Sequence, residues 1–207
     1  MTDNNQPKCK IVLFTANPDD NTSLSLDEEV REIEEKIRAS EHRDTLNLIS
    51  KWGVRPDDLL QTLNEHRPQI VQFSGHGSKH DEILLKDAQG NSKPVGKSAL
   101  KALFATMKDN IRLVILNSCY SKPQAEAIVE VVDCVIGMNT AIGDLAAIIF
   151  VASFYRAIGF GRSVQEAFEQ GKVALMIEGI PEEQTPELLF RDGINPAGVL
   201  LVNERPR

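Results

Sequence analysis

Residues 70–77 (IVQFSGHG) and residues 111–119 (IRLVILNSC) decide the fold of this 207-residue chain. Each is a short apolar run rich in β-branched residues and preceded by polar residues, which is typical of a strand buried on both faces of a parallel sheet. Both runs end abruptly in small or polar residues, and these ends carry His76 and Cys119. Because the carboxyl ends of parallel strands line the ligand crevice of an open sheet, we expect the two side chains to face each other there.

Other apolar segments indicate further strands at residues 10–16, at residues 45–54 as an edge strand, and at residues 134–138. Residues 82–86 and 94–95 flank a Gly/Asn turn, which predicts a small hairpin. We expect residues 181–192 to form a loop and residues 197–202 to form a last edge strand.

Amphipathic spacing predicts the helices, which we place at residues 25–40, 56–65, 98–107, 123–131, 144–158 and 163–177. Capping boxes are expected at two of their starts, where Ser25 and Ser163 each precede a Glu by three residues. Strands and helices alternate along the chain, and this order predicts an α/β fold. We expect a three-layer, doubly wound, mostly parallel sheet with helices on both faces.

The chain is predicted to form one domain. A chain of this length buries about 70% of its unfolded surface in a single core, and neither an internal repeat nor a linker divides it. We expect residues 1–9 to be a flexible N-terminus, residues 10–203 to form the domain, and residues 204–207 to be a tail.

Composition excludes several classes of partner. The net charge of −7 and the isoelectric point near 5.2 argue against nucleic acid and against an anionic membrane, both of which require a basic face. No apolar run approaches the roughly 20 residues of a membrane span, and the N-terminus lacks the apolar core of a signal peptide. Three cysteines, an odd count without paired spacing, predict a reduced cytoplasmic protein.

A single Cys or His at a strand end is most often structural, but the two together favour catalysis. Gly75 and Gly77 remove side chains around His76, which allows a substrate to approach the backbone closely. A thiolate is the attacking species in cysteine catalysis, and a nearby imidazole can accept the proton of a thiol. The backbone N–H groups of Gly77 and Cys119 are candidates for the oxyanion hole.

The sequences FSGHG and VILNSCYS resemble the CHAT domain family, whose caspase-like domains often accompany tetratricopeptide repeats and belong with caspases, metacaspases, separases and gingipains. The resemblance extends over about residues 10–192. It implies a cysteine endopeptidase with His76 as the base, Cys119 as the nucleophile and Gly77 as an oxyanion donor, without a cofactor or an obligatory third carboxylate. It also implies a protein substrate, a regulatory partner or a fused or co-encoded sensor module, and a role in signalling or defence.

Substrate specificity is the least determined property. Asn117 stands two residues before Cys119, where caspases place Gln and metacaspases usually place Asp in the pocket for the residue before the cleaved bond. We expect Asn117, Asp19 and Asp144 to bind the substrate, with a basic or small neutral residue in the pocket. Simpler alternatives are that Asp19 belongs to an Asn-Pro turn and that Asp144 caps a helix.

Two other functions remain open from the sequence. One is a catalytically silent caspase-like module that binds proteins, and the other is a doubly wound domain that binds a small molecule, although a dinucleotide fingerprint is missing. Residues 90–98 (GNSKPVGKS) imitate a phosphate-binding loop, but five residues instead of four separate the glycines. The histidines and cysteines lack zinc-ligand spacing, and we predict neither a metal nor another cofactor.

Overall fold

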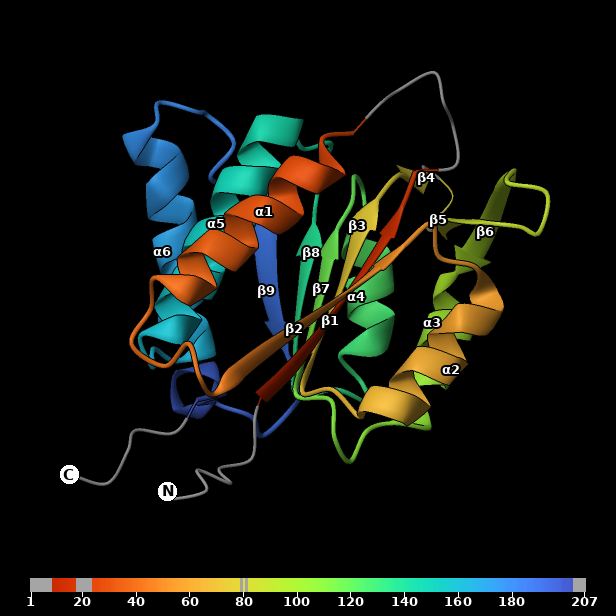
Figure 1. Cartoon of the computed structure of the whole chain (residues 1–207), viewed down its shortest axis with the longest axis horizontal. Helices are drawn as coiled ribbons and strands as arrows, with labels where there is room; N and C mark the ends of the chain where they lie inside the picture. The colour runs from red at the N-terminus through yellow and green to blue at the C-terminus, as the bar shows by residue number, and fades with distance from the viewer. Residues whose placement is uncertain (1–8, 18–23, 79, 81, 203–207) are drawn as a thin grey trace.

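A six-stranded sheet lies at the centre of the computed structural model, which describes residues 9–17, 24–78, 80 and 82–202 (Figure 1). Its strand order is β2-β1-β3-β7-β8-β9, and all neighbours are parallel except the pair β8 and β9. The strands are β1 (Cys9–Ala16), β2 (Leu46–Trp52), β3 (Ile70–Gly75), β7 (Leu113–Asn117), β8 (Cys134–Met138) and β9 (Pro186–Phe190).

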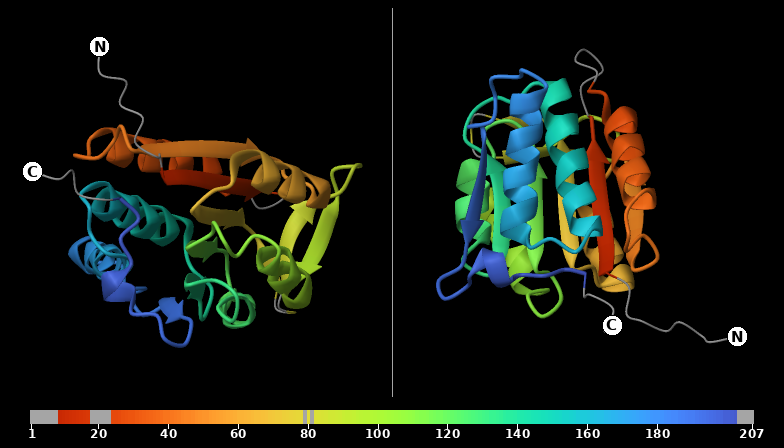
Figure 2. Two further views of the ribbon diagram at one scale, coloured as in Figure 1. Left: turned by 90° about the horizontal axis from the view of Figure 1, so that it is seen from below. Right: turned by 90° about the vertical axis from the view of Figure 1, so that its left-hand side faces the viewer.

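Helices cover both faces of this sheet (Figure 2). One face carries α1 (Leu26–Arg38), α5 (Asp144–Gly159) and α6 (Val164–Ile177), and the other carries α2 (Pro56–His66), α3 (Lys97–Ala105) and α4 (Lys122–Ile128). Successive strand residues point to opposite faces, so the sheet separates two apolar cores. Ile11 and Leu13 pack in the first core, and Val12 and Phe14 pack in the second. The predicted three-layer α/β fold is confirmed.

A small antiparallel sheet extends from the end of β3. It contains β4 (Gly77–Ser78), β5 (Glu82–Lys86) and β6 (Ser92–Gly96), and β5 and β6 form the predicted hairpin. Ile83 and Leu85 point from β5 into the core that contains α2 and α3. The strand that carries His76 therefore continues beyond the main sheet into a second, anchored sheet.

The strand order reverses between β1 and β3, and this reversal determines where a crevice can open. The chain passes from β1 to β2 on one side and then returns to place β3 on the other side of β1. Loops that leave β1 and β3 at their carboxyl ends diverge to opposite faces at such a point, and ligands bind between them. β7 lies next to β3, so the residues that follow it reach the same edge.

The prediction for the C-terminal part is wrong in two places. Residues 186–190, which we expected within a loop, form β9 and pair with β8. Residues 197–202, which we expected as an edge strand, contain the short 3-10 helix η1 (Pro196–Gly198). Val199 and Val202 are buried against α6 and its neighbours, and the Val199 carbonyl accepts a hydrogen bond from Val164. Their apolar character therefore reflects packing on helices instead of strand pairing.

One of the two predicted capping boxes is confirmed. The Ser163 hydroxyl accepts from the Glu166 N–H, and the Glu166 carboxylate accepts from the Ser163 N–H. The box at Ser25 is wrong, because that side chain forms no cap hydrogen bond. The Ser25 N–H instead donates to Oδ2 of Asp144 at 3.3 Å. Asp144 is the first residue of α5 instead of its cap, and this bond joins the starts of α1 and α5.

The remaining predicted strands and helices occur within a few residues of the expected bounds, and β2 is an edge strand as predicted. Most of the proposed N-terminal segment and the C-terminal tail lie outside the described residues, so the domain boundaries stay a prediction. None of the helices in the described part of the chain combines the length and the apolar composition of a membrane crossing.

Candidate active site

The carboxyl ends of β1, β3 and β7 bring the candidate catalytic residues together. His76 directly follows β3, and Cys119 lies two residues after β7. β3 and β7 are adjacent and parallel, with Ser74 opposite Asn117. His76, Cys119 and Asn117 consequently line one small pocket of about 40 Å³, and Asp144 at the start of α5 contributes to its wall.

The backbone at Gly77 lies directly against the backbone of Cys119. A Cβ atom placed on Gly77 would lie 2.1 Å from the carbonyl oxygen of Cys119, far inside any tolerated contact. Only glycine therefore permits the chain after His76 to run this close to the chain that carries the thiol. The two loops are held at van der Waals distance by their main chains.

The imidazole of His76 is oriented by Asn17, the residue that follows β1. His76 Nε2 lies 3.0 Å from Asn17 Oδ1. An amide oxygen only accepts hydrogen bonds, so Nε2 carries the proton in the neutral ring and Nδ1 carries the lone pair. This tautomer gives His76 a basic nitrogen on the ring edge opposite Asn17.

Cys119 differs sharply from the other two cysteines. Its thiol is half-buried and donates to the carbonyl of Ile142 over 3.7 Å. Burial raises the pKa of both Cys9 and Cys134 to about 12, which makes their thiolates scarce at neutral pH. The next residue, Tyr120, adopts a left-handed φ of 56°. Such a conformation is uncommon for residues other than glycine and occurs often at functional sites.

The turn after Cys119 is fastened to the sheet by Ser121. Its hydroxyl donates to the carbonyl of Leu116 at 2.8 Å and accepts from the N–H of Met138 at 3.0 Å. Ser121 is completely buried, so both bonds are made away from solvent, where an unmade bond is costly. The turn is thereby tied to β7 and β8 at the same time.

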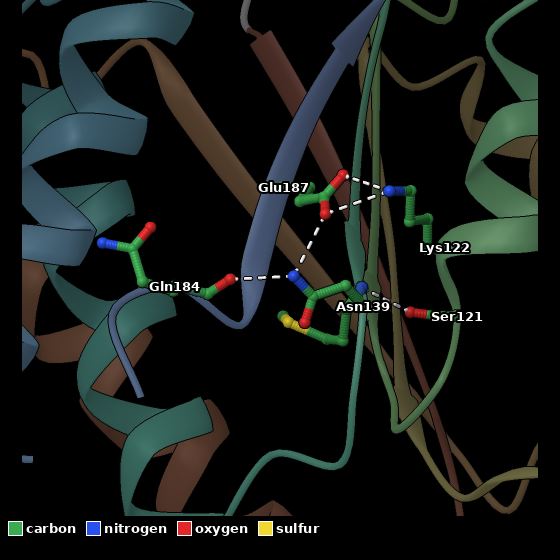
Figure 3. A network of polar contacts seen from close by, with 6 residues as sticks. Ser121, Lys122, Asn139, Gln184 and Glu187 are labelled. Carbon is green, nitrogen blue, oxygen red and sulfur yellow. Dashed lines mark hydrogen bonds and ion pairs between the residues drawn. The ribbon is translucent and has the colours of Figure 1, made fainter. Parts of the chain in front are cut away.

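A second set of contacts links the start of α4 to β9 (Figure 3). Lys122 Nζ lies 2.9 Å from Oε2 of Glu187, and Asn139 Nδ2 donates to Oε1 of Glu187 at 3.0 Å and to the carbonyl of Gln184 at 2.9 Å. Glu187 raises the pKa of Lys122, and Lys122 lowers that of Glu187. These groups are partly exposed, so the pair stabilises the fold only modestly but fixes the register of β9 next to β8.

A buried carboxylic acid, Glu29, forms the floor of the pocket. This residue of α1 is 4% exposed, and its Oε1 accepts hydrogen bonds from Gln72 Nε2 at 2.6 Å and from the Ser74 hydroxyl. Asn117 lies beside the same carboxylate, although neither atom of its amide forms a hydrogen bond of normal geometry within the described residues. Burial raises the pKa of Glu29 from its ordinary value of 4.5 to about 7.

The raised pKa of Glu29 predicts a specific dependence of stability on pH. The folded protein holds this proton more tightly than the unfolded chain, so the stabilisation is complete below pH 4.5 and is lost as the pH rises through 7. The Glu29→Gln variant keeps an acceptor for Gln72 and Ser74 but never ionises. We expect its free energy of unfolding at pH 8 to exceed that of the wild type by up to about 3 kcal/mol, and the difference to shrink towards pH 4.5.

Denaturant titrations at pH 4.5 and pH 8 measure this difference. Glu28→Gln removes an exposed carboxylate from the preceding position of α1 and is the matched control, for which we expect less than about 0.5 kcal/mol at either pH. A Glu29→Gln variant that is less stable than the wild type at pH 8 would show that the charged form is favoured in the fold.

The substrate-binding residues predicted from the sequence have different outcomes. Asn117 is buried at the end of β7, and Asp144 is exposed at the pocket wall, while Asp19 lies outside the described residues. Sequence reasoning missed Asn17 and Glu29. Glu29 had a visible signal, because it falls three residues after Leu26 on the apolar face of its helix. Gln72 and Ser74 are likewise polar at alternate positions of a buried strand.

Curated relatives match most of this chain but are much longer. A "Probable protease" of Gillisia limnaea is 26% identical over 152 residues, which cover 72% of this chain and 27% of the relative. A "Roc-COR-CHAT protease" of an unknown prokaryotic organism is 25% identical over 197 residues, which cover 88% of this chain and 18% of the relative. The match therefore spans about a quarter of the length of the first protein and less than a fifth of the length of the second.

Solved structures of cysteine proteases share the fold. A secreted C11 cysteine protease from Bacteroides thetaiotaomicron, in complex with an irreversible peptide inhibitor, matches with a TM-score of 0.65 at 13% identity, over 88% of this chain and 66% of that one. The Arg-specific proteinase gingipain R matches with a TM-score of 0.63 at 14% identity, over 92% and 47%. The Drosophila initiator caspase Dronc matches with a TM-score of 0.56 at 8% identity, over 92% and 84%.

The sequence motifs, the strand order and these structural neighbours all lead to one family. A family model described as the CHAT domain matches residues 2–186, nearly the whole chain. The model includes both strands whose ends carry His76 and Cys119. The chain therefore belongs to the CHAT domain family and has a caspase-like fold.

Proposed function

We propose that this domain is a cysteine endopeptidase in which Cys119 is the nucleophile and His76 is the general base. The observation that carries the proposal is that both side chains, one from each of two adjacent parallel strands, line the same pocket at the carboxyl edge of the sheet. The protease names of the longer relatives support it. The neighbouring cysteine protease structures support the fold on which the pair stands.

The first chemical step is attack of the Cys119 sulfur on the carbonyl carbon of the cleaved peptide bond. Nδ1 of His76 takes the thiol proton, and Asn17 holds the ring with Nε2 turned away. The protonated imidazole then gives its proton to the leaving amine as the C–N bond breaks, which leaves an acyl-enzyme. A water molecule, deprotonated by His76, attacks this thioester and releases the second product with the thiol restored.

The backbone N–H groups of Gly77 and Cys119 are the proposed donors to the oxyanion of the tetrahedral intermediate. The close approach of the Gly77 main chain to the Cys119 main chain supports this assignment. Fixed main-chain donors stabilise a developing oxyanion without reorganisation, typically by a factor of 10² to 10³ each. Asn117, Asp144 and Asp19 are the proposed substrate-binding residues next to this centre.

The physiological setting is also a proposal. We infer a protein substrate, a cytoplasmic location, and regulation in signalling or defence by a partner or by a fused or co-encoded sensor module. The length of the relatives supports regulation by other modules, since one of them carries Roc and COR names beside CHAT. The acidic composition supports a partner that is neither nucleic acid nor an anionic membrane.

Covalent labelling of the wild-type protein tests the proposed function, because the three thiols serve as internal controls. A peptidyl acyloxymethyl ketone reacts when a thiolate displaces its carboxylate, so the new S–C bond can be located by peptide mapping. We expect an adduct on Cys119 alone, with none on Cys9 or Cys134, whose thiols are buried. Arg, Lys, Leu and Asp in the first position of the probe cover the main pocket chemistries.

The main alternative is a catalytically silent module that binds partner proteins through the same fold. Labelling of all three thiols at similar slow rates, or of none, would favour that alternative. In that case Cys119→Ala would leave partner binding unchanged, because a silent module does not need the thiol.

A further inference from the structure

Apart from the His76 imidazole, the charged groups among the described residues of the pocket next to Cys119 are acidic. Glu29 lies at its floor and Asp144 at its wall, whereas no Lys or Arg is among the described residues that line it. Asp144 is exposed, but Glu29 is almost completely removed from solvent. A buried carboxylate without a cation is expensive, because its charge loses the solvation of water and gains little in return.

Within the described residues, the polar groups around Glu29 form hydrogen bonds of normal geometry with only one of its two carboxylate oxygens. Oε1 accepts the two hydrogen bonds of normal geometry, from Gln72 and Ser74, and the Asn117 amide lies beside the carboxylate without forming a third of normal geometry. Beside it, both polar atoms of the Asn117 amide also lack a hydrogen-bond partner in that part of the chain, although Asn117 is 95% buried and lines the pocket. Groups of this kind are rare in folded proteins, and a water molecule, an ion or a ligand usually satisfies them.

We propose that this pocket binds the side chain of the substrate residue before the cleaved bond, and that Glu29 selects a basic side chain there. The inference rests on the proposed function for the identity of the ligand. It narrows the expectation from the sequence, which left a basic or a small neutral substrate residue open for this pocket. The charge that position 117 lacks is supplied from α1, and the Asn117 amide is placed to accept a second N–H of the same cation.

The size of the pocket fits the head group of such a side chain. Its volume of about 40 Å³ is close to the roughly 30 Å³ that a water molecule occupies in the liquid. The ammonium of lysine is of similar size, whereas the guanidinium of arginine is larger. Both basic residues are therefore tested.

Paired probes that differ only in charge give the sharpest test. Acyloxymethyl ketones with arginine or its neutral isostere citrulline, and with lysine or norleucine, are compared at pH 8 by the rate of adduct formation on Cys119. We expect the wild type to prefer each charged probe by about 100-fold, and Glu29→Gln to lose this preference to within a few-fold. Asp144→Asn, at the exposed wall, should lower the preference less than tenfold.

Glu28→Gln is the control on the same helix and should leave the ratios unchanged. Adducts on Cys119 whose charged-to-neutral ratio is the same in Glu29→Gln and the wild type would overturn the inference while the proposed function stands. Absence of every adduct would overturn the proposed function instead. Agmatine is then titrated into Cys119→Ala and into the double variant Cys119→Ala/Glu29→Gln, which tests the inference by binding alone. Equal affinities of the two proteins for agmatine would reject the inference.

Discussion

Replacing Cys119 by Ala is expected to abolish labelling and peptide hydrolysis, and replacing His76 by Ala is expected to lower both by about 10³-fold. The thiol forms the covalent bond, so nothing else in the pocket can take its place. General acid-base catalysis by a positioned side chain contributes about 10² to 10⁴, and an imidazole-free site still holds substrate next to the sulfur. Cys119→Ala is therefore expected to be inactive, whereas His76→Ala is expected to keep residual activity.

Intact-mass kinetics over a range of pH separates these cases. Residual labelling of His76→Ala should rise steeply with pH, because hydroxide replaces the missing base, whereas Cys119→Ala stays unlabelled throughout. His80→Ala removes an exposed imidazole four residues further along and should label at the wild-type rate. Labelling of Cys119→Ala at the wild-type rate would place the nucleophile elsewhere.

Replacing Gly77 by Ala is expected to damage both the fold and the site. The new methyl group would lie 2.1 Å from the carbonyl oxygen of Cys119, and a main-chain atom cannot rotate away as a flexible side chain can. We expect a loss of about 3 kcal/mol in the free energy of unfolding, at the upper end of the usual cost of overpacking. The labelling rate of the folded fraction should fall about 100-fold, the penalty of a misplacement near 1 Å.

Gly96→Ala is the matched control, because nothing lies within 4 Å of a Cβ placed there and Gly96 also belongs to a strand of the small sheet. We expect it to cost less than about 1 kcal/mol and to label normally. Thermal unfolding gives the stability of each variant, and the amplitude of the labelling reaction gives the fraction of the protein that is folded. A Gly77→Ala protein that is stable and labels at the wild-type rate would show that the two main chains can separate at no cost to the site.

The centre of the fold follows from the sequence because its strands are unambiguous. β7 is apolar on both faces, β3 is apolar except at Gln72 and Ser74, and only a sheet with a helical layer on each side buries them. His76 and Cys119 could be placed at a common edge for the same reason. β9 was missed because PELLF carries neither β-branched residues nor alternation, so its pairing with β8 is a tertiary effect.

The polar floor of the pocket was missed because its members look ordinary one at a time. Glu29 sits in a helix rich in glutamates, most of them exposed, and only the packing of α1 on β3 distinguishes it. Asn17 precedes a proline and resembles a turn residue, whereas its contact with His76 depends on β1 lying next to β3. Such contacts link residues 43 to 59 positions apart, a distance that local patterns do not encode.

The interior position of β1 has a consequence for the timing of synthesis. The first three strands of the sheet to be made, β2-β1-β3, are contiguous in space and can pair as soon as β3 has been synthesised. The pocket, however, also needs Ile142, Asp144 and Ile148, which are made much later. A nascent chain therefore contains His76 before the pocket is complete, and the pocket forms only when α5 has docked.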